Sequence, residues 1–105
     1  MVKVIGNKAE FDGVLKGSGD TLIVVDFFAT WCGPCVNIAP VYQKLSGEYS
    51  DCIFLKVDVD EAEDVAAECG ISAMPTFHCY RGGKKVDELV GASEDKLREM
   101  IEKNK

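Results

Sequence analysis

Two cysteines three positions apart, Cys32 and Cys35, have the clearest capacity for chemistry in this sequence. They belong to the segment WCGPC at residues 31–35, directly after an apolar run at residues 22–29. A helix that begins here places Cys32 at its N-terminus, where partial positive charge and unpaired N–H groups favour a thiolate. Because the thiolate is the attacking species in disulfide exchange, Cys32 is the predicted nucleophile. Cys35 lies one helical turn further, and it is placed to attack back once Cys32 has bonded to a substrate sulfur.

A closed zinc site is the alternative for two cysteines at this spacing. Such a site needs four ligands, which commonly come as two close pairs. The remaining candidates are Cys52, Cys69, Cys79 and His78. Since they contain no second Cys-x-x-Cys pair, we expect no metal.

The other three cysteines and the single histidine are expected to be structural. Cys79 alternates with Phe77 in an apolar strand and is predicted to lie in the core. Cys52 opens a strand, and Cys69 closes a helix, where the helix dipole disfavours a thiolate. His78 lies in a strand without the partners of a catalytic triad. Regulatory oxidation of one of these cysteines is the alternative that the sequence leaves open.

Asp26 is a carboxyl group inside the apolar run, with no polar residue on either side. Burial disfavours the charged form of a carboxylate, so the pKa of Asp26 is expected to rise. A carboxyl group in that state can accept the proton of Cys35 as Cys35 becomes the attacking thiolate.

The composition is that of a globular domain. The chain has 105 residues, of which 47% are hydrophobic and 29% charged, which predicts a single domain over residues 1–105 with a core of its own. A net charge of −6 argues against nucleic acid or an anionic membrane as partner, since both need basic surface. No segment has the length of a membrane span, and the first residues do not resemble a secretion signal. A cytoplasmic location is therefore expected, where five cysteines are thiols rather than a disulfide framework.

Hydrophobic periodicity predicts the elements that position these residues. Strands are expected at residues 2–5, 22–29, 53–60, 76–81 and 85–90. Helices are expected after Asn7, from near Cys32, after Asp60 and after Ser93. Asp60 with Glu63 three residues later resembles a capping box. The order βαβαβαββα indicates parallel crossovers followed by an antiparallel hairpin.

Several separate features make the chain resemble the thioredoxin family. They are Val25-Asp26-Phe27, WCGPC, Pro40, Val57-Asp58-Val59-Asp60, Met74-Pro75-Thr76 and Gly91-Ala92. The resemblance implies an α/β three-layer fold, in which a central mixed five-stranded sheet is flanked by four helices. It also implies a protein-disulfide reductase, a dithiol–disulfide oxidoreductase that binds no cofactor itself. An NADPH-dependent thioredoxin reductase would restore the dithiol, and the implied substrates are disulfide-containing proteins such as peroxiredoxins and ribonucleotide reductase.

The resemblance also assigns roles to individual residues. Asp26 becomes the proton acceptor for Cys35, and Lys56 modulates that carboxyl group, although an ordinary surface lysine is the alternative. Pro75 is expected to follow a cis peptide bond, which leaves the Met74 backbone free to pair with an extended substrate. The expected substrate surface consists of Trp31, Gly33, Pro34, Met74, Pro75, Gly91 and Ala92.

Val36 departs from the family pattern, because many members carry a basic residue directly after the second cysteine. This change bears on which partners dock best rather than on the chemistry. One alternative function is that of an oxidase or isomerase of the secretory pathway, and Gly33 and Pro34 between the cysteines count against it. A second alternative is a binding module whose redox state gates association. The presence of both cysteines and Asp26 favours catalysis over that alternative.

Overall fold

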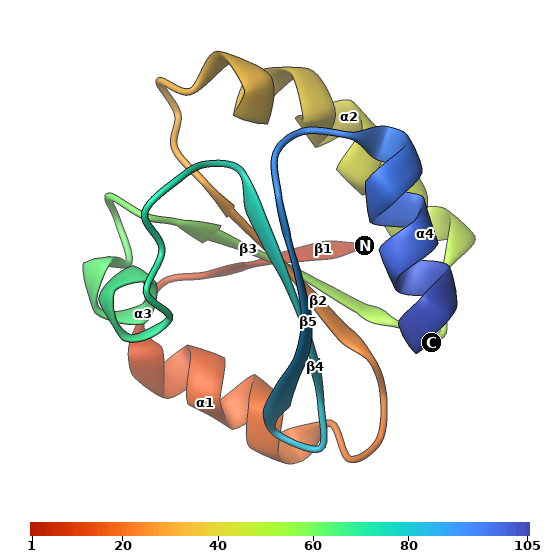
Figure 1. The fold of residues 1–105 in the computed structure, drawn as a ribbon. Helices are drawn as coiled ribbons and strands as arrows, with labels where there is room; N and C mark the ends of the chain where they lie inside the picture. Colours follow the sequence, from red (N-terminus) through yellow and green to blue (C-terminus); the bar gives the residue numbers. More distant parts are fainter.

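A five-stranded sheet runs through the centre of the protein, in a computed structural model that describes residues 1–105 (Figure 1). The strands are β1 (Val2–Ile5), β2 (Ile23–Phe28), β3 (Ile53–Asp58), β4 (Thr76–Arg81) and β5 (Lys84–Val90). The helices are α1 (Lys8–Gly17), α2 (Gly33–Glu48), α3 (Glu63–Glu68) and α4 (Glu94–Asn104). The strand order is β1-β3-β2-β4-β5, with parallel pairs among the first three strands and antiparallel pairs from β2 to β4 and β5. The predicted mixed sheet with four helices is therefore confirmed.

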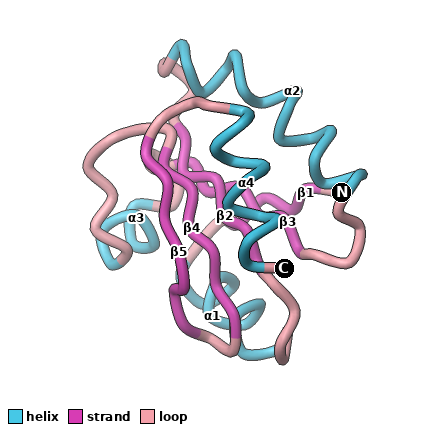
Figure 2. Tube along the Cα trace, turned by 45° about the vertical axis from the view of Figure 1, so that its right-hand side comes forward, coloured by secondary structure: helices cyan, strands magenta, loops and turns pink.

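β2 lies in the middle of the sheet because it is apolar on both faces. Five of its six residues are buried. Val25 and Phe27 pack towards α1 and α3, whereas Val24 packs towards α2 and α4. The two pairs of helices thus cover opposite faces of the sheet, as Figure 2 shows. None of the four helices combines the length and hydropathy that a membrane span requires.

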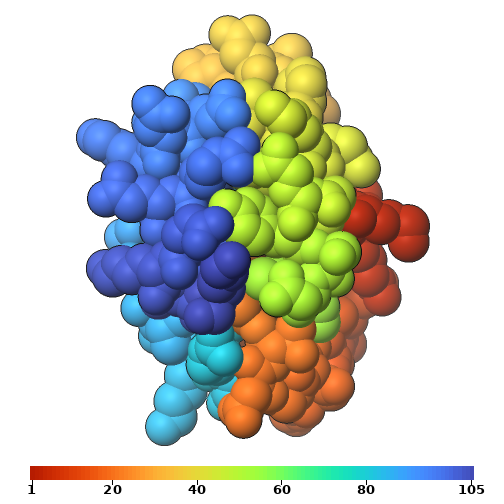
Figure 3. Space-filling model, turned by 90° about the vertical axis from the view of Figure 1, so that its right-hand side faces the viewer, coloured from red at the N-terminus to blue at the C-terminus, as the bar shows by residue number.

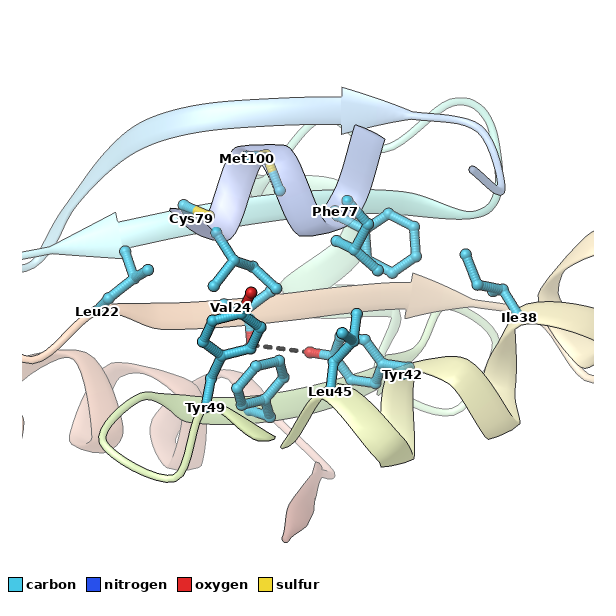
Figure 4. Close-up of a cluster of buried hydrophobic side chains, with 12 residues drawn as sticks. Leu22, Val24, Ile38, Tyr42, Leu45, Tyr49, Phe77, Cys79 and Met100 are labelled. Atoms are coloured by element: carbon cyan, nitrogen blue, oxygen red, sulfur yellow. Dashed lines mark hydrogen bonds between the residues drawn. The ribbon is translucent and has the colours of Figure 1, made fainter. Parts of the chain in front are cut away.

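Tyr42 attaches α2 to the centre of the sheet (Figure 4). Its side chain is fully buried, and its hydroxyl lies 3.0 Å from the Val24 carbonyl oxygen and 2.7 Å from that of Leu55. Its ring also packs edge-on against Phe54, with 5.4 Å between the centroids. These contacts hold α2 over β2 and β3, and α2 carries the cysteine pair at its start.

α4 packs beside the C-terminal end of α2 on the same side of the sheet (Figure 3). Leu97 and Ile101 are fully buried under this helix. At the rim, Arg98 donates to Glu48 at 2.6 Å, and the Tyr49 hydroxyl donates to Glu102 at 2.5 Å. The apolar contacts set the position of α4, and the exposed ion pair adds little to it.

Two of the predicted helix caps are confirmed. The Asn7 side chain accepts a hydrogen bond from the backbone of Glu10, and the Ser93 hydroxyl accepts one from the backbone of Lys96. Each satisfies an N–H group that the first turn of a helix leaves unpaired.

The capping box predicted at Asp60 is wrong. α3 begins at Glu63, and its cap residue is Ala62, which offers no side-chain acceptor. The predicted strands at 22–29 and 53–60 are also longer than β2 and β3. Of the residues beyond the strands, Ala29 and Val59 pack at the cysteine pair and Asp60 contacts Trp31, whereas Leu22 lies in the core at the other end of β2.

Candidate functional site

Cys32 and Cys35 form a disulfide at the N-terminus of α2, with 5.2 Å between their Cα atoms. Cys32 is the cap residue of the helix, and its sulfur accepts a hydrogen bond from the Cys35 N–H at 3.2 Å. The same sulfur lies 3.7 Å from the Met74 carbonyl oxygen. The predicted placement of Cys32 at a helix N-terminus is therefore observed.

The helix N-terminus gives this pair its electrostatic setting. N–H groups of the first turn have no partner within the helix, and they carry the positive end of the helix dipole. Pro34 sits in this turn, where no N–H group is needed. When the disulfide is reduced, the hydrogen bond and the dipole both favour a negative charge on the Cys32 sulfur.

Both cysteine residues are largely covered in this oxidised form. Cys32 is 7% exposed and Cys35 3% exposed. Ala29 is buried with them, and Met74 packs against the same small cluster. Of the two cysteines, Cys32 is therefore the one nearer to solvent.

Asp26 is buried on β2, in register with Lys56 on the neighbouring strand β3. Its side chain is 1% exposed, and its Oδ1 atom has no hydrogen-bond partner. Burial raises the pKa of Asp26 to about 7, and the positive charge of Lys56 acts in the opposite direction. The rise expected from the sequence is therefore present. Asp26 shares with Val24 the face of β2 that α2 covers, which is also the side of the cysteine pair.

Lys56 lies half-buried beside the site. Its Nζ atom is 4.5 Å from the centre of the Phe28 ring. A hollow of about 230 Å³ separates it from the first turns of α2. The lining residues are Phe28, Ala29, Thr30, Cys35, Val36, Ala39 and Lys56. Lys56 and Cys35 therefore border the same hollow.

Trp31 projects from the loop before α2 and is 69% exposed. Its indole N–H donates a hydrogen bond to the Asp60 carboxylate at 2.9 Å. Asp60 was expected to cap α3, and its contact with Trp31 was missed because it joins residues 29 positions apart. The Val57-Asp58-Val59-Asp60 motif was the only signal that this carboxylate belongs near the site.

The remaining residues of the predicted substrate surface lie in the first turn of α2, in the loop before β4 and in the loop after β5. The Met74–Pro75 peptide bond is cis, as expected. The Gly91 N–H donates to the Pro75 carbonyl at 3.0 Å, which joins the loop after β5 to the loop before β4. Gly91 has a φ of 111°, a value that favours glycine. Gly33, Pro34 and Ala92 are exposed.

The remaining cysteines lie away from the pair. Cys79 is fully buried in the core, as expected, and burial raises the pKa of its thiol to about 12. Cys52 and Cys69 are free and half-buried, and His78 is 2% exposed. No three side chains of His, Cys, Asp or Glu are grouped where they could hold a metal ion.

Comparison with known proteins connects this geometry with one family. The sequence pattern of the Thioredoxin family matches residues 2–103. The chain is 52% identical over 101 residues to Thioredoxin from Homo sapiens and 50% identical over 101 residues to Thioredoxin from Gallus gallus, with 96% of each chain covered in both cases. It also resembles the X-ray structure of Fasciola hepatica thioredoxin, with a TM-score of 0.97 and 47% identity over 98% of this chain and 99% of that one.

Proposed function

The chain belongs to the thioredoxin family, and we propose a role for each of its site residues in the reduction of a disulfide. It is a dithiol–disulfide oxidoreductase that acts on disulfide-containing proteins. One observation carries the assignment of roles. The Cys32 sulfur accepts the Cys35 N–H at the N-terminus of α2, so this sulfur is the one on which negative charge is stabilised.

The reaction proceeds in two exchanges. The Cys32 thiolate attacks one sulfur of the substrate disulfide, the substrate S–S bond breaks, and its other sulfur leaves as a thiolate. Cys35 then attacks the Cys32 sulfur, which breaks the mixed disulfide and releases the second substrate thiolate. Two electrons pass from the dithiol to the substrate, and the Cys32–Cys35 disulfide is the oxidised product.

Asp26 accepts the proton that Cys35 must lose before the second exchange. With its pKa raised to about 7, this carboxyl group has both protonation states available at neutral pH. The positive charge of Lys56 lowers that pKa and thereby adjusts the fraction of Asp26 ready to accept a proton. Proton exchange with solvent would use the hollow that Lys56 and Cys35 share.

Trp31, Gly33, Pro34, Met74, Pro75, Gly91 and Ala92 make up the substrate surface. An extended substrate segment would pair with the Met74 backbone, which lies beside the Cys32 sulfur. At the edge of this surface, the exposed Val36 stands where many family members carry a basic residue. Its apolar side chain favours partners that present an apolar group at this point.

Electrons return to the disulfide from NADPH through a thioredoxin reductase, so that the chain needs no cofactor of its own. Peroxiredoxins and ribonucleotide reductase are the proposed physiological substrates. We place the protein in the cytoplasm, because three free thiols suit a reducing compartment.

An insulin-reduction assay coupled to NADPH and a thioredoxin reductase tests this function. The wild-type protein should consume NADPH continuously and precipitate the insulin chains. Cys32→Ser should abolish turnover, and Cys52→Ser is the matched control that should retain it. Turnover by Cys32→Ser at the wild-type rate would refute the proposed role of Cys32.

A further inference from the structure

A second hollow, of about 380 Å³, is lined by residues of α1, α3 and the β4–β5 hairpin. The helices α1 and α3 lie on the opposite side of the sheet from α2 (Figure 1). Phe11, Leu15 and Val65 form its apolar wall. Its volume lies in the range of about 300–1,000 Å³ that small-molecule sites occupy. Neither Cys32 nor Cys35 borders it, so it is separate from the site of disulfide reduction. We refer to it as the α1–α3 hollow.

A chain of close contacts joins four hydrogen-bonding groups, three of which border this hollow. The Cys69 sulfur is 3.5 Å from the Tyr80 hydroxyl oxygen, and that oxygen is 3.2 Å from His78 Nδ1. On the other side of the ring, His78 Nε2 is 3.3 Å from the Glu88 carboxylate. Cys69, Tyr80 and His78 border the hollow, and Glu88 faces His78 across the β4–β5 pair. A thiol, a phenol, an imidazole and a carboxylate therefore form one relay.

The order of these groups sets the direction in which a proton can move. The Glu88 carboxylate accepts the Nε2–H of His78, which leaves Nδ1 as an acceptor for the Tyr80 hydroxyl. The Tyr80 oxygen can then accept the Cys69 S–H. Because burial lowers the pKa of His78, the imidazole is neutral near pH 7 and able to take a proton.

The position of Cys69 makes its thiol a poor nucleophile in the absence of a base. It lies at the C-terminal cap of α3, where the helix dipole disfavours negative charge. Burial also raises the pKa of its thiol. A thiol in this position is unreactive unless a base removes its proton as it attacks, which is the task that His78 can perform through Tyr80.

Charges of both signs surround the mouth of the hollow. Lys8 pairs with Asp12 at 2.6 Å and with Glu68 at 3.1 Å, and Lys85 pairs with Glu88 at 2.9 Å. These pairs are partly exposed, so they can exchange partners at little cost. A ligand with both an ammonium and a carboxylate group would find a partner for each.

We propose that Cys69 is a second thiol-exchange site, which takes small zwitterionic disulfides of the cystine type into the α1–α3 hollow. The Cys69 proton passes to Tyr80 as Tyr80 passes its own proton to His78. The Cys69 sulfur attacks one sulfur of the ligand and forms a mixed disulfide, while the ligand S–S bond breaks. The other half leaves as a thiolate and takes up the proton from His78. The exchange needs no further oxidant, because the ligand disulfide is reduced as Cys69 is oxidised.

The experiment uses the full chain with Cys32 and Cys35 as their disulfide, so that only Cys52, Cys69 and Cys79 are thiols. The protein is incubated with cystine, and each adduct is located and timed by peptide mass spectrometry. Cys52, which is half-buried like Cys69 but has no imidazole in its surroundings, serves as the internal control. Cys69 should form its adduct at least about tenfold faster than Cys52, because a general base commonly accelerates a reaction by that much or more. Equal rates would overturn the proposal.

Two variants separate the relay from a structural role. Tyr80→Phe keeps the ring that packs on Phe11 and removes only the hydroxyl, and His78→Gln removes the base. Each should lower the Cys69 rate to about that of Cys52 and leave the Cys52 rate unchanged. An unchanged Cys69 rate in both variants would refute the relay.

The pH profile gives a readout that altered packing would not imitate. The groups that face His78 are Tyr80 on its own strand and Glu88 and Lys85 on β5. Tyr80 in turn contacts Cys69 at the end of α3. The charged groups at the mouth of the hollow are Lys8, Asp12 and Glu68. As the pH is raised, the rate of adduct formation at Cys69 should increase while His78 loses its proton below neutral pH. Above that range the rate should level off. In His78→Gln it should rise only in alkaline solution, with the ionisation of the thiol itself. Identical profiles would contradict the proposal.

A comparison of two ligands tests the chemical class. Hydroxyethyl disulfide is small and uncharged, whereas cystine carries both charges at each end. The ratio of the Cys69 rate to the Cys52 rate should be several-fold higher with cystine. An equal ratio for the two disulfides would refute recognition of a zwitterion.

Discussion

At the level of single residues, burial of the Asp26 carboxyl group destabilises the fold and at the same time gives this group a pKa suited to proton transfer. Nothing donates a hydrogen bond to its Oδ1 atom, and Lys56 is the only charge that acts in favour of its ionised form. Burying a carboxylate with so little compensation destabilises the fold. The same burial brings its pKa to the range in which a proton acceptor is most useful.

The first prediction concerns stability. The pKa of Asp26 rises from 3.8 to about 7 on folding, so between these values the folded chain binds more protons and its free energy of unfolding falls as pH rises. A shift of this size corresponds to about 4 kcal/mol. Asp26→Asn should therefore be more stable than the wild type at about pH 8, with the difference shrinking towards about pH 4. Urea denaturation of the oxidised proteins measures this, and a less stable variant at the higher pH would contradict it.

The second prediction concerns the rate of the second exchange. Asp26→Asn removes the acceptor that we propose for the Cys35 proton but leaves the N-terminus of α2 and the Cys32 sulfur in place. Release of the reduced substrate should slow by about 10²-fold, the lower range for loss of a general base, while formation of the mixed disulfide should change much less. Rapid mixing with acid quenching separates the two steps. Equal slowing of both would show that Asp26 acts on Cys32 instead.

At the scale of elements, α2 joins the core to the chemistry. Its apolar face is buried through Ile38, Tyr42 and Leu45, and its first turn holds the cysteine pair. The start of this helix was predictable from the local sequence, because the apolar strand ends just before the cysteine pair and Pro34 suits the first turn of a helix. The start of α3 was not, since the Asp60 side chain turns to a residue of another loop instead of capping its own helix.

The third prediction tests the attachment of α2 to the sheet. Tyr42→Phe removes the hydroxyl that bridges the Val24 and Leu55 carbonyl oxygens and preserves the ring. The free energy of unfolding should fall by about 1–2 kcal/mol, the usual cost of one buried hydrogen bond. Chemical denaturation measures the change, and alkylation of reduced Cys32 serves as the control that should stay unaltered. A variant as stable as the wild type would show that the bridge contributes nothing.

At the scale of the whole molecule, the net charge of −6 shapes encounters with substrates. Asp60 and Glu61 are exposed near Trp31, whereas Lys56 is half-buried. A partner with basic residues around its disulfide is therefore attracted to this face, and an acidic partner is repelled.

The fourth prediction follows from this charge. Two peptide disulfides of matched length, one flanked by lysines and one by glutamates, should differ in rate at low ionic strength, with the basic peptide faster. Added salt of about 0.5 M should remove most of the difference, because it shortens the screening length to a few ångströms. The same rate for both peptides at low salt would contradict steering by the charge of the protein.

Much of the fold was predictable because its signals are local. The apolar run around Asp26, the caps at Asn7 and Ser93 and the glycines at the hairpin all act over a few residues. The contacts that were missed join distant segments. Trp31 donates a hydrogen bond to Asp60, and the Cys69 sulfur contacts the Tyr80 hydroxyl, which in turn contacts His78. No local sequence pattern predicts these contacts. The C-terminal ends of β2 and β3 were also predicted too long, because the apolar run continues to Ala29 and the alternating pattern to Asp60, beyond the last paired residues.

Trapping of the mixed disulfide tests most directly whether Cys32 attacks and Cys35 resolves. Each cysteine is changed to serine in turn, the variant is mixed with a protein disulfide, and the products are separated without reductant and weighed by mass spectrometry. Cys35→Ser should accumulate a covalent complex through Cys32, because nothing remains to release it. Cys32→Ser should form none at neutral pH. A stable complex through Cys35 in Cys32→Ser, with none in Cys35→Ser, would reverse the assignment.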